Sequence, residues 1–117
     1  MDVLIVDDDE LNGRALSRVL KSRHAVRVAT SAAKALAAVR AHTPDVVLCD
    51  FDLGDHTSAV FLRTVAREHP GCRLVLYSAS KPELWQDLLT DHVIDEVLIK
   101  PITTDALLAS LVRRSGG

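Results

Sequence analysis

Aromatic residues are scarce in this sequence of 117 residues: they make up only 3% of it, although hydrophobic residues of all kinds make up 48%. A core with so few rings must be built from aliphatic side chains. Cysteine is equally rare, and two cysteines provide no disulfide framework of the kind that holds small secreted domains together. We expect Cys49 to be a buried free thiol and the protein to lie in the reducing environment of the cytoplasm.

Basic residues are not in excess either, since 14 Lys and Arg stand against 16 Asp and Glu and give a formal net charge of −2. We therefore expect no direct nucleic-acid binding. The apolar runs have the length of strands, far below the roughly 20 residues of a membrane span, so we expect no membrane insertion. The first ten residues also lack the features of a secretory signal. The length suits a single domain over residues 1–117.

Short apolar runs alternate with helical patterns along the whole chain. In the helical patterns, apolar residues recur at spacings of three and four. The runs do not alternate with polar residues, so we expect strands buried on both faces, as in a parallel sheet with helices on each side. The predicted fold class is therefore α/β, with a doubly wound five-stranded parallel sheet. The predicted strands are Val3–Val6, Ala25–Ala29, Val46–Cys49, Leu74–Tyr77 and Val97–Ile99.

Residues that favour helix starts precede the helical patterns. The segment Ser80–Glu83 combines a capping box with a proline in the first turn, and it predicts the start of a helix. Trp85 lies at helical spacing in that segment, which indicates a place in the core or on a surface that faces a partner. The other capping candidates are Thr30 or Ser31, Thr57 or Ser58, and Thr103 or Thr104.

Acidic residues follow two of the predicted strands, at the carboxyl ends where open α/β sheets bind ligands. Asp7, Asp8 and Asp9 follow the first strand, and Asp50 and Asp52 follow the third. Three acids in a row exceed what a helix cap needs. If the two strands are neighbours, these carboxylates repel one another unless a counterion lies between them. Oxygen ligands at strand ends suit Mg²⁺, which we predict as the cofactor.

Two other polar residues end strands of the same predicted sheet. Ser78 ends the fourth strand and Lys100 ends the fifth. A metal ion, an ammonium group and a hydroxyl around one carboxylate would stabilise a phosphoryl group on that carboxylate. We therefore interpret Asp50 as a nucleophile that accepts a phosphoryl group as an acyl phosphate, with Ser78 and Lys100 assisting.

Four segments of the chain resemble, in order and spacing, the receiver domain of two-component response regulators: VLIVDDDE, PDVVLCD, LVLYSA and IKP. The resemblance implies a flavodoxin-like (βα)5 fold with sheet order 2-1-3-4-5. It also implies Mg²⁺ held by Asp7 or Asp8, by Asp50 and by the main-chain carbonyl of Asp52. The implied phosphodonor is a phosphohistidine on a sensor histidine kinase or a histidine phosphotransfer protein.

The same resemblance implies a surface for a downstream protein, formed by the helix after Ser80, the strand Val97–Ile99 and the helix after Thr103. It also implies a cis peptide bond between Lys100 and Pro101. Asp52 occupies a place where the family tunes the lifetime of the phosphate, and an acid there can add a metal ligand or steer the hydrolytic water.

Two positions depart from the family pattern. Receivers often carry an aromatic residue three positions before the lysine, where this chain has Val97, whereas Tyr77 directly precedes Ser78. Val97 favours a receiver that only relays phosphate, or one attached to a kinase such as a hybrid histidine kinase. The loop after the acceptor lacks the proline often found there, and Gly54 is the candidate for its turn.

Two alternatives to a phosphoacceptor receiver are open. The segment LCDFDLGDHTS also resembles the first motif of haloacid-dehalogenase-type phosphatases, with Asp50 as nucleophile and Asp52 as general acid/base. That family begins with this strand and places its further acid pair after the lysine, whereas here the acid pair comes first. Val97 allows a receiver-like module that works without phosphate, but the presence of Asp7, Asp8, Asp50, Ser78 and Lys100 argues against one. We expect no enzymatic activity other than the domain's own phosphorylation and dephosphorylation.

Overall fold

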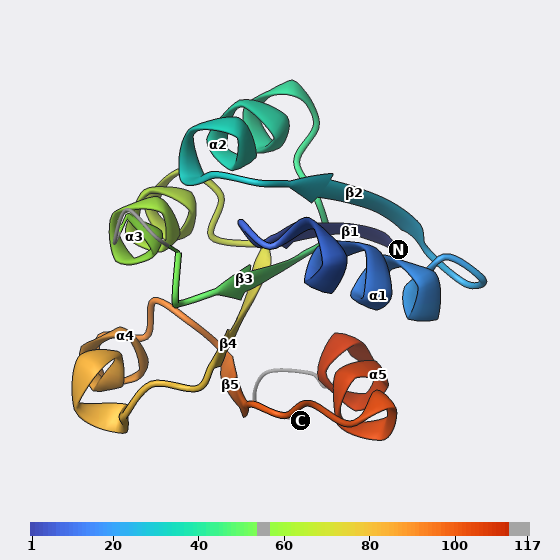
Figure 1. The fold of residues 1–117 in the computed structure, drawn as a ribbon. Helices are drawn as coiled ribbons and strands as arrows, with labels where there is room; N and C mark the ends of the chain where they lie inside the picture. Colours follow the sequence, from blue (N-terminus) through green and yellow to red (C-terminus); the bar gives the residue numbers. More distant parts are fainter. Residues whose placement is uncertain (54–56, 113–117) are drawn as a thin grey trace.

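The computed structural model describes residues 1–53 and 57–112, and within them it has a sheet of five parallel strands. The sheet order is β2-β1-β3-β4-β5, which confirms the predicted doubly wound α/β fold (Figure 1). Both Gly54 and His56, the histidine nearest to Asp50 in the sequence, lie outside the described residues. The strands are β1 (Asp2–Val6), β2 (Ala25–Ala29), β3 (Val46–Asp50), β4 (Arg73–Ser78) and β5 (Glu96–Ile99).

Helices cover both faces of the sheet. Figure 1 shows α1 and α5 on one side and α2 and α3 on the other. A short 3₁₀ helix and a short α-helix lie between β4 and β5. The helices are α1 (Glu10–Leu20), α2 (Ala32–Ala41), α3 (Ser58–Glu68), η1 (Pro82–Leu84), α4 (Gln86–Thr90) and α5 (Thr104–Val112).

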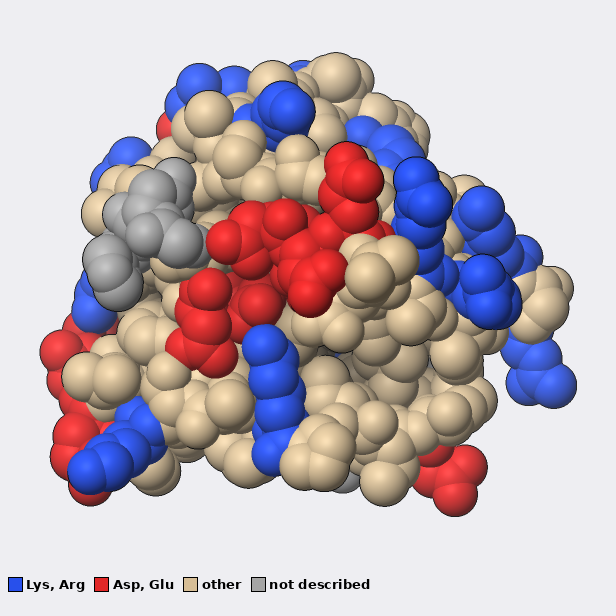
Figure 2. Space-filling model, viewed as in Figure 1, with Lys and Arg blue, Asp and Glu red and all other residues tan. Residues whose placement is uncertain are grey.

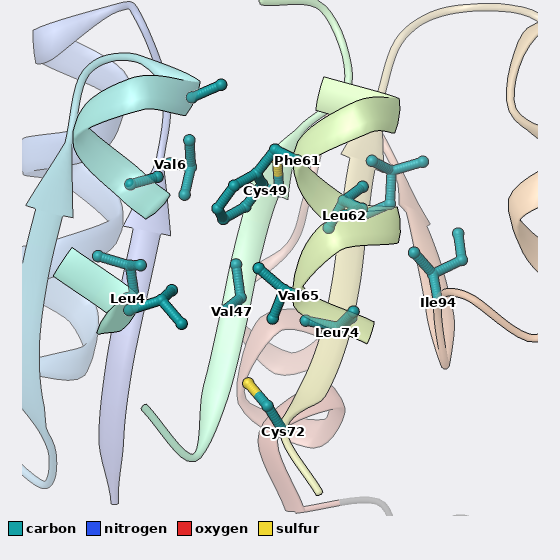
Figure 3. Close-up of a cluster of buried hydrophobic side chains, with 14 of the residues drawn as sticks. Leu4, Val6, Val47, Cys49, Phe61, Leu62, Val65, Cys72, Leu74 and Ile94 are labelled. Carbon is teal, nitrogen blue, oxygen red and sulfur yellow. The ribbon is translucent and has the colours of Figure 1, made fainter. Parts of the chain in front are cut away.

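The core has two layers because successive strand residues point to opposite faces of the sheet. In β1, Leu4 and Val6 face α2 and α3, whereas Val3 and Ile5 face α1 and α5. Figure 3 shows the first layer, in which strand side chains meet Phe61 and its neighbours from α3. Strands β1, β3 and β4 are buried on both faces, as predicted.

The two edge strands, β2 and β5, are more exposed than predicted. The lack of alternating polar residues had indicated burial on both faces. Val28 in β2 is 42% exposed and Ile99 in β5 is 56% exposed. A strand at the edge of a sheet has one neighbour instead of two, so less of its surface is removed from water. Close packing still reaches β2, because a Cβ atom added to Gly13 of α1 would lie 2.9 Å from Cγ1 of Val28.

Some of the helix caps predicted from the sequence are present in the structure. Asp9 caps α1 by accepting hydrogen bonds from the amides of Leu11 and Asn12, and Ser31 caps α2 by accepting one from Lys34. At α5 the Thr103 hydroxyl accepts a hydrogen bond from the amide of Ala106. At the start of α3, Ser58 Oγ instead donates to the carbonyl of Phe51, which ties the helix to the segment after β3.

The helix predicted to start at Ser80–Glu83 is confirmed in part, because helical structure begins at Pro82 but Ser80 does not cap it. The chain forms η1 from Pro82, with Lys81 at the capping position, and α4 begins only at Gln86. Ser80 Oγ donates its hydrogen bond to the carboxylate of Asp52 instead. The side chain of Ser80 thus engages Asp52, and no side-chain hydrogen bond caps η1.

Three smaller expectations are confirmed. Cys49 and Cys72 are buried free thiols, and burial raises the pKa of Cys72 to about 12. The Lys100–Pro101 peptide bond is cis. Trp85 is 6% exposed and its Nε1 donates a hydrogen bond to the carbonyl of Ser80. Within the described ranges, none of the helices combines the length and apolarity that crossing a bilayer requires.

Candidate functional site

The carboxyl ends of the strands bring the predicted site residues to one edge of the sheet. Val6 pairs with Cys49 and Asp50 pairs with Tyr77, so the residues that follow β1 and those that end β3 and β4 lie side by side. Figure 2 shows acidic side chains gathered into one patch, with a basic side chain against its lower border. Parallel pairing in register therefore creates the charged site.

Three carboxylates converge at this edge. Carboxylate oxygens of Asp7, Asp8 and Asp50 all lie within 4.8 Å of one another, a spacing that could hold a metal ion. Asp7 is fully buried and Asp50 is 3% exposed, whereas Asp8 is exposed to solvent. The structure thus brings together the three side chains whose convergence the sequence predicted, and oxygen-only ligands of this kind suit Mg²⁺.

Several interactions act on the pKa of Asp50 in opposite directions. Burial raises its pKa above the ordinary value, and the nearby charge of Asp7 acts in the same direction. The amide of Asp52, which donates to Oδ1 at 2.9 Å, and the Lys100 ammonium lower the pKa but do not offset burial. Added positive charge at the site, such as a bound cation, would therefore favour the ionised form of Asp50.

Lys100 is the positive group at this site. Its Nζ lies 3.1 Å from each carboxylate oxygen of Asp50 and 3.8 Å from Oδ2 of Asp52. It also lies over the ring of Tyr77, with 5.4 Å between Nζ and the ring centroid. The lysine is thus held against the predicted acceptor, as the sequence analysis expected.

The remaining predicted residues have partners in the loop after β4. Ser78 is fully buried, and its Oγ accepts a hydrogen bond from the amide of Ser80 at 2.8 Å. The Asp52 carboxylate accepts hydrogen bonds from Ser80 Oγ and from the amide of Ala79. The side chain of Asp52 is therefore directed at this loop, and the metal contact predicted for its main-chain carbonyl stays a prediction.

Tyr77 is a site residue whose contacts the sequence analysis did not identify. Its hydroxyl donates a hydrogen bond of 2.8 Å to Oδ2 of Asp7, and its side chain is 1% exposed. Burial, together with the charge of Asp7, raises the pKa of Tyr77, so the hydroxyl stays protonated and able to donate. The available sequence signal was its position at the end of a buried strand, directly before Ser78.

A cavity of about 600 Å³ adjoins the site between α1 and the segment after β5. Its wall is mostly apolar, and Lys100 and Tyr77 contribute to it. The other lining residues are Asn12, Ala15, Leu16, Ala79, Pro101 and Ile102.

Fold and site together define a receiver domain. The sequence matches the response regulator receiver domain family over residues 3–112, and the chain therefore belongs to this family. It is 31% identical over 113 residues to the transcriptional regulatory protein ZraR of Escherichia coli, covering 95% of this chain and 25% of ZraR. It is 27% identical over 115 residues to the acid tolerance regulatory protein ActR of Sinorhizobium medicae, covering 97% of this chain and 59% of ActR. The chain thus spans only part of these relatives.

Solved structures show the same fold. A CheY-like receiver domain protein from Methanospirillum hungatei superposes with a TM-score of 0.88 at 22% identity, covering 94% of this chain and 89% of that one. A response regulator from Burkholderia pseudomallei, solved with a phosphorylated aspartic acid, a calcium ion and citrate, has a TM-score of 0.87 at 23% identity. That match covers 98% of this chain and 68% of the other.

Proposed function

We propose that residues 1–117 form one cytoplasmic receiver domain in which Asp50 accepts a phosphoryl group in a reaction that requires Mg²⁺. The observation that carries this proposal is the placement of Asp50. Its carboxylate belongs to a cluster of three whose oxygens lie within 4.8 Å, and both of its oxygens lie 3.1 Å from the Lys100 ammonium. Phosphoryl transfer needs little beyond such positioning and charge neutralisation.

The transfer step uses Asp50 as the nucleophile. A carboxylate oxygen of Asp50 bonds to phosphorus while the P–N bond of a phosphohistidine breaks, and the electron pair stays on the imidazole nitrogen. Mg²⁺, held by Asp7, Asp8, Asp50 and the Asp52 carbonyl, would neutralise negative charge on the transferring group. The donor is a sensor histidine kinase or a histidine phosphotransfer protein.

Lys100 and Ser78 stabilise the product. Lys100 already lies against the Asp50 oxygens, so its ammonium pairs with a phosphoryl oxygen once the acyl phosphate forms. The Ser78 oxygen accepts from the Ser80 amide, which leaves the hydroxyl proton for a second phosphoryl oxygen. Hydrolysis of the acyl phosphate returns the domain to its starting state.

The downstream protein binds the face formed by α4, β5 and α5. Two large apolar side chains on or next to this face are exposed: Leu84 in η1 by 64% and Ile99 in β5 by 56%. Exposed apolar side chains can contribute to a protein-binding surface. The site connects to this region because Asp52 contacts Ser80, whose carbonyl accepts the indole hydrogen bond of Trp85.

Mass spectrometry after treatment with acetyl phosphate tests the function. We expect one phosphoryl group on the wild-type protein with Mg²⁺, none with EDTA, and none on Asp50→Asn. Asp105→Asn removes an exposed acid on α5 and should be phosphorylated like the wild type. Sustained hydrolysis of a generic phosphate ester would favour the phosphatase alternative, and a wild type that never gains phosphate would favour a phosphate-independent module.

A further inference from the structure

Tyr77 connects two parts of the site that lie on different strands. Its ring belongs to the core layer under α1 and α5, and its hydroxyl reaches across to Asp7 after β1, although β3 lies between β4 and β1. The O–O distance of 2.8 Å and the 1% exposure of the side chain describe a well-formed buried hydrogen bond. Such a contact to a carboxylate is stronger than one between neutral groups.

Both oxygens of Asp7 are held by the protein. Oδ2 accepts from Tyr77, and Oδ1 accepts from the amide of Asp9 at 2.9 Å. Two donors on opposite oxygens fix the rotation of the carboxylate group. Each carboxylate oxygen has about two lone-pair sites, so each keeps one for a cation. The buried acid is thus oriented by the protein itself, with coordination capacity left over.

The ring of Tyr77 also contacts Lys100, the positively charged residue of the site. Lys100 Nζ lies 5.4 Å from the ring centroid, within the range of a cation–π contact. Tyr77 therefore touches one residue of the acidic cluster through its hydroxyl and the lysine through its ring.

We propose that Tyr77 is a positioning residue whose hydroxyl holds Asp7 in the orientation that binds Mg²⁺. This inference rests on the proposed function, because it takes the cluster of Asp7, Asp8 and Asp50 as the metal site. Hydrogen bonds from neighbouring groups orient metal ligands in proteins, and losing one typically weakens metal binding by about 10- to 100-fold. The Tyr77 hydroxyl donates to Asp7 and not to Asp50, so on this proposal the hydroxyl acts on phosphorylation only through the metal.

The test compares Tyr77→Phe with the wild type in direct Mg²⁺ titrations by calorimetry. Phenylalanine keeps the ring over Lys100 and removes only the hydroxyl, so we expect the Kd for Mg²⁺ to rise by roughly 10-fold or more. In phosphorylation by acetyl phosphate, the half-saturating Mg²⁺ concentration should rise equally, while the rate at saturating Mg²⁺ stays near that of the wild type. A merely structural role would not produce this split.

Ser110→Ala provides the matched control. Ser110 is also a fully buried hydroxyl, and its Oγ donates to the carbonyl of Leu107 on α5 instead of to the site. We expect this variant to lose stability in urea denaturation with EDTA, as Tyr77→Phe does, but to bind Mg²⁺ like the wild type. A second check is the double variant: once Asp7→Asn is present, Tyr77→Phe should weaken Mg²⁺ binding no further.

The two proposals fail in different ways. A wild type that does not bind Mg²⁺ would overturn the metal site itself. A wild type that binds Mg²⁺, with Tyr77→Phe binding it within two-fold as tightly, would overturn the positioning role and leave the proposed function standing. An additional loss from Tyr77→Phe in the Asp7→Asn background would also contradict it, because the hydroxyl would then act through another group.

Discussion

Neutralising Asp50 should stabilise the protein when no metal is present. Asp50 is 3% exposed, and burial together with the charge of Asp7 raises its pKa, so the folded state disfavours its ionised form. The substitution Asp50→Asn removes that charge with little change in shape. It also leaves Lys100 an amide oxygen to contact and keeps the Asp52 carboxylate 3.8 Å from the ammonium.

The size of the gain follows from the spacing of the cluster. Two unit charges at the 4.8 Å that bounds the cluster repel by about 3 kcal/mol at an effective dielectric constant near 20. By the same measure the lost attraction between Asp50 and Lys100, 3.1 Å apart, is about 5 kcal/mol, so the sign of the effect depends on burial of the carboxylate, which is the largest cause of its raised pKa. We therefore expect Asp50→Asn to raise the free energy of unfolding by about 1–3 kcal/mol in EDTA at neutral pH.

The pH dependence has a definite sign. A carboxyl group whose pKa is raised in the folded state takes up a proton on folding between that pKa and the unfolded value, near 3.8. Protonation removes the unfavourable charge from the wild type as the pH falls through this window. The stability advantage of Asp50→Asn should therefore be full at neutral pH and shrink on acidification.

Urea denaturation in EDTA, from pH 7 downward, measures this difference. Asp105→Asn, an exposed acid on α5, should change the free energy of unfolding by less than about 1 kcal/mol. Mg²⁺ at 100 times its Kd should then stabilise the wild type by about 2.7 kcal/mol and Asp50→Asn by less, because a ligand is lost. If Asp50→Asn is less stable than the wild type in EDTA at neutral pH, the pairing with Lys100 outweighs burial, and the reasoning is refuted.

Three other outcomes follow from the same contacts. Lys100→Ala should fold and bind Mg²⁺ yet be phosphorylated by acetyl phosphate at least ~10-fold more slowly, since the group that faces the phosphoryl oxygens is gone; an unchanged rate measured by mass spectrometry would contradict this. Gly13→Ala should cost roughly 1–2 kcal/mol in urea denaturation, because overpacking against Val28 Cγ1, 2.9 Å from the new methyl group, outweighs a gain of about 1 kcal/mol in helix propensity; no loss would contradict this and show that Val28 or α1 moves to admit the methyl group. Mg²⁺ with BeF₃⁻ should change Trp85 fluorescence through the contact between its indole and Ser80, and a constant signal at saturation would count against switching in this region.

Residues at strand ends could be identified from the sequence because the strands themselves are unambiguous. The strand Val46–Asp50 is apolar up to Asp50, and parallel pairing must then bring Asp7, Asp8, Asp50 and Lys100 to the same edge. The order of the strands came from the family resemblance and not from hydrophobic patterning, which carries no information about which strands are neighbours.

The contacts made by Ser80 and Tyr77 could not be predicted in the same way. A capping box is a local pattern, whereas the acceptor that engages Ser80 is Asp52, 28 residues earlier in the chain. Likewise, the Tyr77 hydroxyl meets a partner 70 residues away, across an intervening strand. Both contacts depend on where side chains end after the sheet has formed, and local propensity does not report this.

A crystal structure with Mg²⁺ and BeF₃⁻ bound would test the proposed chemistry most directly. We predict beryllium bonded to an Asp50 oxygen, Mg²⁺ contacting Asp7 or Asp8, Asp50 and the Asp52 carbonyl, and fluorides contacting Lys100 Nζ and Ser78 Oγ. Beryllium bonded to another residue, or a metal ion held away from Asp50, would contradict the assignment of Asp50 as the phosphoacceptor.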